Sequence, residues 1–200
     1  MLDQEVEIEK AKAIDKSEVR SWIALFCPYG CRDCLFWCTL KQDNLFTLLM
    51  LTFRPAQVDD LPLLVQMLAD DPLGKQREDF RIPLPQSYST AFQQIDQDPN
   101  QELMVFLDAE ANIAGMFQLS FLPYLTYRGG TRAQMEGVRI RKDLRGQGLG
   151  TQVFNWVIQR AKERGAHVLQ LTTDKKRPDA LRFYEKLGFV ASHEGMKLHL

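Results

Sequence analysis

A glycine-rich turn between a short strand and an amphipathic helix constrains the fold of this chain more than any other feature. The turn has the sequence Arg145-Gly146-Gln147-Gly148-Leu149-Gly150, and a strand is expected before it at residues 136–140. A helix over residues 148–164, which Gly165 is placed to end, and a second strand over residues 168–171 follow. This order predicts one β-loop-α-β unit at the centre of the molecule.

The glycines suit this turn for binding an anion such as a phosphate. Without Cβ atoms, successive N–H groups can point at one anion, and the helix that begins here adds the positive end of its dipole. Two familiar phosphate-binding patterns do not match, because no lysine follows Gly150 and Thr151 stands where the dinucleotide pattern needs its third glycine. A turn that merely connects two elements is the alternative.

Together with a second motif near the C-terminus, this turn resembles the GNAT superfamily of acyl-CoA-dependent N-acetyltransferases. The central motif of that superfamily reads Arg/Gln-x-x-Gly-x-Gly/Ala, and residues 145–150 have its common form. Residues 180–189, Ala-Leu-Arg-Phe-Tyr-Glu-Lys-Leu-Gly-Phe, match the second signature, A-x-x-F-Y-x-x-x-G-F. The two motifs stand in the expected order, so the resemblance rests on more than one short pattern.

The residues before the second signature depart from the commonest pattern of the superfamily. Many members have an asparagine where this chain has Arg177, and Lys175 and Lys176 precede it. In this respect the chain is similar to the small-amine branch that includes aminoalkylphosphonate acetyltransferases. The three basic residues would meet the 3′-phosphate of the cofactor or an anionic acceptor, or lie in a solvated turn.

The resemblance covers about residues 50–200 and implies a GNAT fold of the α+β class. Such a fold has α/β/α layers around a mixed, mostly antiparallel sheet of about six to seven strands, with about four helices. We expect residues 50–200 to form the N-acetyltransferase domain and residues 1–49 to be a leader with a helix and a cysteine-rich segment. Within the domain we expect strands at residues 51–54, 103–107, 113–122 and 189–200, and helices at residues 58–68, 87–98 and from 177 onward.

The same resemblance implies which residues bind acetyl-CoA, the expected co-substrate. Strand 136–140 would lie beside the pantetheine arm and bond to it through the backbone of Val138 and Ile140, as an added strand would. The N–H of Val138 would face the thioester oxygen, and the turn would hold the pyrophosphate. The full set is Val138, Arg139, Ile140, Arg145, Gly146, Gln147, Gly148, Leu149, Gly150 and Thr151.

Transfer of an acetyl group from a thioester to an amine needs a base for the amine and an acid for the departing thiolate. Tyr184 is our candidate for the acid, because its helical face can point to the cofactor while Phe183 fills the core. Alternatively, Tyr184 is a packed aromatic that bonds a backbone carbonyl. Glu136 is our candidate for the base, acting directly or through a water, and an outward-facing strand charge is its alternative.

We therefore expect an acetyl-CoA-dependent N-acetyltransferase that acetylates a primary amine of a small molecule by direct attack in a ternary complex. The alternatives are a protein or peptide N-terminal acetyltransferase and a non-catalytic acyl-CoA-binding module. The segment through residue 85 is expected over the acceptor. Its carboxylates, which would hold a cationic amine or form a solvated acidic loop, are Asp70, Asp71, Glu78 and Asp79.

Composition argues against several other classes of protein. A net charge of −1 over 200 residues gives no basic excess for nucleic acid. The longest apolar run, at residues 45–51, is far shorter than the roughly 20 residues of a membrane span, and residues 1–20 are too charged for a signal peptide. We expect a cytoplasmic protein without nucleic-acid or membrane partners, whose C-terminal edge strands allow a homodimer.

All four cysteines lie between Cys27 and Cys38. Their C-x3-C-x2-C spacing is similar to the iron–sulfur ligands of radical S-adenosylmethionine enzymes, and such thiolates could hold a cluster or a zinc ion. Those enzymes surround the motif with a large barrel, so we expect four reduced thiols and no bound metal here. Met50 starts a stretch similar to the usual opening of the superfamily, so translation that begins there is a further interpretation.

Overall fold

The computed structural model describes residues 51–70 and 74–198. The predicted leader, its boundary with the domain, the four cysteines and Asp71 lie outside the described residues. None of the helices within these two ranges is both long enough and apolar enough to span a membrane.

The described residues form a sheet of five strands in the order β1-β2-β3-β4-β5. Neighbours from β1 to β4 run antiparallel, whereas β5 runs parallel to β4, so the predicted mixed and mostly antiparallel sheet is confirmed. The strands are β1 (Thr52–Pro55), β2 (Gln101–Leu107), β3 (Ile113–Pro123), β4 (Thr131–Ile140) and β5 (Ala166–Leu171).

The strand count is lower than the six to seven that we predicted, because residues 189–198 do not form a strand. Three of their apolar side chains, Val190, Met196 and Leu198, are exposed. This segment is paired with no strand in the described part of the chain, and an unpaired strand has no ladder of hydrogen bonds to hold it extended.

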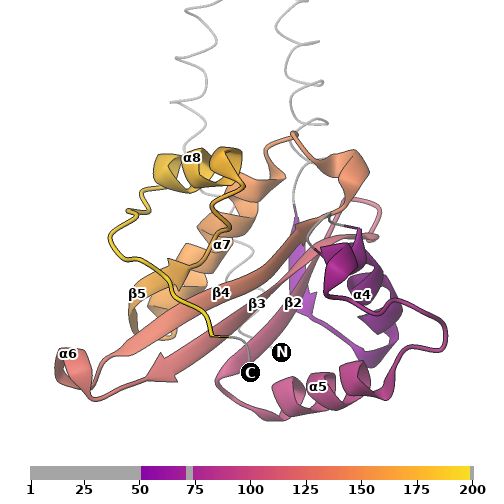
Figure 1. The fold of residues 1–200 in the computed structure, drawn as a ribbon, viewed down its shortest axis with the longest axis horizontal. Helices are drawn as coiled ribbons and strands as arrows, with labels where there is room; N and C mark the ends of the chain where they lie inside the picture. The colour runs from indigo at the N-terminus through magenta and orange to yellow at the C-terminus, as the bar shows by residue number, and fades with distance from the viewer. Residues whose placement is uncertain (1–50, 71–73, 199–200) are drawn as a thin grey trace, which may run out of the picture. The chain divides into compact units, whose positions relative to one another are not determined.

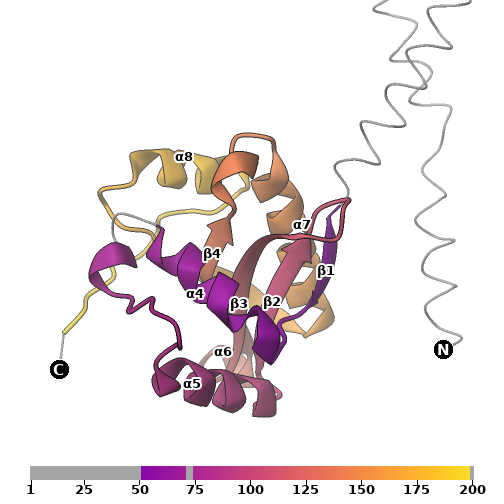
Figure 2. The ribbon, with the colours of Figure 1, turned by 90° about the vertical axis from the view of Figure 1, so that its right-hand side faces the viewer.

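Four helices of nine or more residues are described, as predicted: α4 (Leu61–Ala69), α5 (Gln86–Gln97), α7 (Leu149–Glu163) and α8 (Pro178–Lys186). A single turn, α6 (Thr126–Gly129), joins β3 to β4 at the end of the long strands (Figure 1). Short 3₁₀ turns lie at Val58–Asp60, Gly74–Gln76 and Lys142–Leu144. In Figure 2, α4 and α5 lie on one side of the sheet and α7 on the other, which gives the predicted layers.

Each face of the sheet has its own apolar core, because side chains alternate between the two faces of a strand. On the α7 face, Phe117 and Met135 pack against Phe154 and Val157 of the helix. On the α4 face, the core is smaller and includes Leu64 of the helix and Met116 of β3. The helix α7 is therefore fixed firmly behind the strand that precedes the glycine-rich turn.

Glycines mark both ends of α7, and ion pairs with Glu102 hold its last turns. Gly148 at its start has φ +81° and Gly165 after its end has φ +71°, so the predicted end of the helix is confirmed. Arg160 Nη2 lies 2.7 Å from Glu102 Oε1, and Arg164 Nη1 lies 2.8 Å from the same oxygen. These ion pairs join the last turns of α7 to β2.

Candidate active site

The strands β4 and β5 run side by side only as far as Met135 and Leu171. Beyond that pair, β4 continues to Ile140 with β3 on one side and no described strand on the other. The N–H of Arg141 donates to the carbonyl of Ala114 on the β3 side at 2.8 Å, so strand alternation turns the backbone of Ile140 toward the free edge. Such an edge can bind an extended ligand as an added strand.

A bulge lies in the middle of this free stretch. The register of β3 with β4 shifts between Met116 and Gln118, and Gly137 has φ +62°. A residue in this left-handed conformation is usually glycine, and bulges of this kind bend a strand next to many active sites. After the bulge, Val138 and Ile140 pack toward the core on the α7 face.

The glycine-rich turn follows at the end of β4 and is open where an anion would bind. Gly146 has φ +78°, and a Cβ built on it or on Gly148 would have no atom within 4 Å. Within the described ranges, the amides of Gly146, Gln147 and Gly148 donate to no backbone carbonyl. Because the first amides of a helix also lack intrahelical acceptors, several N–H groups are available at the start of α7.

Two side chains of the turn bond back to the preceding backbone and stabilise its shape. Arg145 Nε donates to the carbonyl of Ile140 at 2.9 Å, and Gln147 Nε2 donates to the carbonyl of Asp143 at 3.0 Å. Arg145 therefore lies between the free edge of β4 and the turn. On the strand itself, Arg139 Nη1 donates to the carbonyl of Val138 at 2.8 Å.

Gly150 has a different role from the other two glycines of the motif. A Cβ on Gly150 would lie 3.1 Å from Phe183 Cζ, so the absence of a side chain lets α8 pack closely on the start of α7. Phe183 and Tyr184 both lie against Phe154 of α7, with ring centroids 5.6 and 5.4 Å away. The third glycine thus helps to position the candidate acid.

Tyr184 is half-buried beside the free stretch of β4. Burial raises the pKa of the Tyr184 phenol, and the positive charges of Arg177 and Arg139 oppose that rise. Its ring packs against Phe154, Phe183 and Phe189, as the alternative interpretation expects, and its hydroxyl donates to no backbone carbonyl among the described residues. A phenol that keeps its proton at neutral pH can act as an acid.

Glu136 lies just before the bulge, on the sheet face turned away from α7. Its side chain is exposed, and Oε1 accepts a hydrogen bond from Gln134 Nε2 at 3.3 Å. Within the described ranges no hydrogen bond joins Glu136 to Tyr184. Glu136 thus lies on the face turned away from α7, whereas Tyr184 packs on the α7 face.

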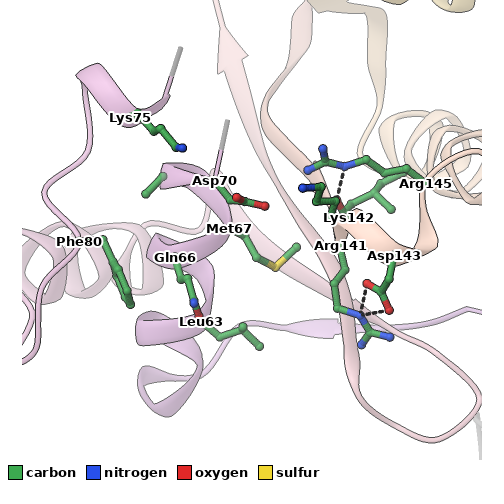
Figure 3. Close-up of a pocket in the computed structure, with 12 residues that line it drawn as sticks. Leu63, Gln66, Met67, Asp70, Lys75, Phe80, Arg141, Lys142, Asp143 and Arg145 are labelled. Carbon is green, nitrogen blue, oxygen red and sulfur yellow. Dashed lines mark hydrogen bonds and ion pairs between the residues drawn. The ribbon is translucent and has the colours of Figure 1, made fainter. Parts of the chain in front are cut away.

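A cleft of about 880 Å³ lies between α4 and the end of β4 (Figure 3). One wall is largely apolar and the other is basic, and Asp70 extends between them from the end of α4. Sequence reasoning missed most of the basic wall, although basic residues around the glycine-rich turn were a visible signal. The lining residues are Leu63, Gln66, Met67, Ala69, Asp70, Lys75, Phe80, Ile140, Arg141, Lys142, Asp143 and Arg145.

The predicted acidic candidates are not gathered in one place. Asp70 lines the cleft, whereas Glu78 accepts a hydrogen bond of 2.9 Å from the hydroxyl of Tyr88, and Asp79 pairs with Arg81 at 3.3 Å. Of the predicted basic residues, Lys175 pairs with Glu194 at 3.0 Å on the surface, and Arg177 lies near Tyr184. Among the described residues, no cluster of three or more metal-binding side chains occurs.

Comparisons with known proteins agree with this geometry. The model of the Acetyltransferase (GNAT) family matches residues 70–189. A crystal structure of a transcriptional regulator from Bacillus halodurans C-125 is 57% identical, with a TM-score of 0.72, over 76% of this chain and 100% of that one. A predicted acetyltransferase from Clostridium acetobutylicum, solved with acetyl-CoA, shares the fold at 22% identity and a TM-score of 0.58, over 75% of this chain and 96% of that one.

Among curated proteins, aminoalkylphosphonate N-acetyltransferase from Salmonella typhimurium is 30% identical over 96 residues, which are 48% of this chain and 61% of that protein. L-methionine sulfoximine/L-methionine sulfone acetyltransferase from Pseudomonas aeruginosa is 29% identical over 91 residues, 45% of this chain and 51% of that protein. The chain thus spans about half to three fifths of the length of these two relatives.

Proposed function

The chain belongs to the Acetyltransferase (GNAT) family, and from this premise we propose that it transfers the acetyl group of acetyl-CoA to a primary amine of a small molecule. The observation that carries the proposal is the continuity of two features. The free edge of β4 ends at Ile140, and the open turn at Gly146 and Gly148 follows within a few residues. One ligand with an extended arm followed by a diphosphate would fit both.

The described residues fit acetyl-CoA. Val138 and Ile140 would bond its pantetheine arm, and the amides of the turn with the Thr151 hydroxyl would hold its pyrophosphate. Arg145, already bonded to the Ile140 carbonyl, would add positive charge at the junction of the two. When bound, acetyl-CoA would supply the thioester whose acetyl group is transferred.

The roles of the two candidate catalytic residues follow from their surroundings. Glu136 is exposed to solvent at the face where an amine could arrive, so its carboxylate would take the proton that an ammonium must lose before it attacks. Tyr184, whose raised pKa keeps the phenol protonated, would give a proton to the departing sulfur. We expect no covalent intermediate on the protein, because no step needs one.

A small acceptor is supported by the curated relatives. The names of the Salmonella and Pseudomonas proteins give small amine-bearing molecules as their acceptors. A protein or peptide N-terminal acetyltransferase would need a groove that is open at both ends.

A thiol-release assay with acetyl-CoA tests the proposal directly. The purified chain is mixed with acetyl-CoA and a panel of small primary amines and, separately, with short peptides. We expect release of coenzyme A that depends on one or more of the small amines. Release with peptides alone would favour the N-terminal acetyltransferase instead.

A second candidate is a non-catalytic acyl-CoA-binding module. The relative from Bacillus halodurans is called a transcriptional regulator, and a domain that senses acyl-CoA would suit such a protein. Tight binding of coenzyme A without turnover on any amine or peptide would support this candidate.

A further inference from the structure

A row of polar side chains crosses four strands on the sheet face turned away from α7. Gln101 of β2 lies opposite Ser120 of β3, Ser120 lies opposite Gln134 of β4, and Gln134 lies opposite Gln170 of β5. The α7 face at this level is mostly apolar, apart from Glu102. Polar residues are common on a face of an antiparallel sheet that meets solvent, so this row indicates that the face is open to solvent here.

One end of the row is hydrogen-bonded to the candidate base. Arg132 Nη1 donates to Gln170 Oε1 at 3.5 Å, Gln170 Nε2 donates to Gln134 Oε1, and Gln134 Nε2 donates to Glu136 Oε1 at 3.3 Å. Every amide accepts on one side and donates on the other, so the bonds run in one direction from a cation to a carboxylate. This arrangement holds Glu136 in a defined position at the edge of the row.

The other end of the row lies under α5 and has unused hydrogen-bonding capacity. Gln101 Oε1 accepts from Gln118 Nε2 at 2.9 Å and from Ser120 Oγ at 2.7 Å, which occupies both lone pairs. The amide nitrogen of Gln101 and the amide oxygen of Gln118 have no bond to any described residue. A donor and an acceptor therefore lie next to each other at this end.

These groups face open space. A groove of about 290 Å³ lies between the row and α5, and Gln101, Gln118 and Ser120 form its floor. The opposite wall is mixed, with Ala91 and Ile95 of α5 apolar and Gln94 and Asp98 polar. Gln118 lies directly opposite Glu136 in the register of β3 with β4, so the groove adjoins the candidate base.

We propose that this polar row is the floor of the acceptor site and that it selects a small amine bearing several hydroxyl groups, of the amino-sugar or amino-polyol class. The proposal rests on the proposed function and adds the class of acceptor. A hydroxyl can accept from the Gln101 amide nitrogen while it donates to the Gln118 oxygen, and the C–H surface of the same molecule can contact Ala91 and Ile95. An acceptor without hydroxyls would leave both amide groups desolvated and unpaired.

The test compares glucosamine with cyclohexylamine, two primary amines on six-membered rings, in the thiol-release assay. We expect the wild-type protein to use glucosamine with a kcat/KM about a hundred-fold or more above that of cyclohexylamine. The variants Gln101→Leu and Gln118→Leu should each reduce this preference about ten-fold or more. The preference, which is the ratio of kcat/KM for the two amines, is compared between wild type and variant. The different basicities of the two amines affect both proteins equally and therefore cancel.

The matched control is Gln159→Leu on α7, whose amide bonds Glu163 at 3.0 Å on the opposite side of the sheet. It should leave the preference unchanged. All variants should bind coenzyme A as the wild type does, which shows that they are folded. An unchanged preference in both Gln101→Leu and Gln118→Leu would overturn the proposal.

Direct binding separates this proposal from the proposed function. Each amine is titrated calorimetrically into protein saturated with coenzyme A. Binding of glucosamine that is lost in Gln118→Leu supports the polar floor even if no amine is acetylated, in which case only the acetyl transfer fails. Turnover of other amines without binding of glucosamine would support the acetyltransferase function and would contradict the proposed role of the polar row as the floor of the acceptor site.

Discussion

Gly150 lies against the ring of Phe183, so the last glycine of the first motif contacts the aromatic residue of the second motif. The two motifs are therefore joined by a packing contact. The glycine-rich turn and the helix that carries Tyr184 are held in a fixed relation by it. This explains why a small residue is needed at a position whose φ is ordinary for a helix.

Replacement of Gly150 by alanine should change the free energy of unfolding by less than about 1 kcal/mol. The gain in helix propensity, about 0.5–1 kcal/mol, is opposed by a Cβ that must displace the Phe183 ring by a few tenths of an ångström. In a Phe183→Leu background the opposition is removed, so Gly150→Ala should stabilise. Denaturant unfolding of the four proteins measures the coupling, and purely additive effects would contradict the contact.

Replacement of Gly148 by alanine should weaken coenzyme A binding about ten-fold or more. An alanine at φ +81° is strained by about 1–2 kcal/mol, and its Cβ would stand in the open space that we assign to the pyrophosphate. Gly165→Ala is the matched control, since it has φ +71°, similarly open surroundings and a place at the other end of α7. The control should lose similar stability and keep its affinity for coenzyme A.

Replacement of Tyr184 by phenylalanine should lower kcat about a hundred-fold while coenzyme A binding is retained. The raised pKa of Tyr184 means that the wild-type phenol stays protonated up to and beyond its ordinary value of 10.0, so kcat should not fall below that pH through loss of this proton. For the same reason, the stability that the buried neutral phenol contributes is present below pH 10 and is lost only above it. Undiminished activity in the variant would remove Tyr184 as the acid.

Replacement of Asp60 by asparagine should lower the free energy of unfolding by about 1–2 kcal/mol at neutral pH. Arg54 bonds both carboxylate oxygens at 2.7 and 3.0 Å, and this contact lowers the pKa of Asp60 below its ordinary value of 3.8. A lowered pKa gives stability that is present above about pH 4 and is lost as pH falls through the lowered value. The difference between wild type and variant, followed from pH 7 to pH 2, should therefore shrink only in the acid range.

Replacement of Glu102 by glutamine should lower the free energy of unfolding by about 2–3 kcal/mol without effect on coenzyme A binding. The Glu102 side chain is 13% exposed and accepts from both Arg160 and Arg164, which anchor the end of α7 far from the turn. Glu163→Gln is the control, because Glu163 is 50% exposed and its ion pair with Arg160, at 3.6 Å, is longer than that of Glu102. The control should lose less than about 0.5 kcal/mol. Equal losses in the two variants would contradict the anchoring role of Glu102.

Much of the central unit could be predicted because its signals are local. The glycines at the start of α7 and the glycine at its end mark the helix boundaries by backbone conformation, and both boundaries are confirmed within one residue. The strand before the turn was predicted too short, since β4 begins at Thr131 rather than at residue 136. In the first half of that strand, polar residues such as Gln134 alternate with buried residues, and the polar ones hid the strand from prediction.

The parts that could not be predicted depend on contacts between distant segments. The polar row that includes Gln101 and Gln170 exists only through the register of four strands, which no short stretch of sequence contains. The packing of Gly150 on Phe183 likewise depends on the approach of two helices. The closing strands that we expected over residues 189–200 are not formed at residues 189–198, because an apolar alternating segment becomes a strand only beside a partner strand.

The central claim is that the free edge of β4 and the open turn after it bind one nucleotide thioester ligand. Isothermal titration of coenzyme A into the wild-type protein, beside Gly148→Ala and Gly165→Ala, tests this claim most directly. We predict binding at one site per chain that is weakened at least about ten-fold by Gly148→Ala and unchanged by Gly165→Ala. No heat of binding with the folded wild-type protein, or equal affinities in the two variants, would contradict it.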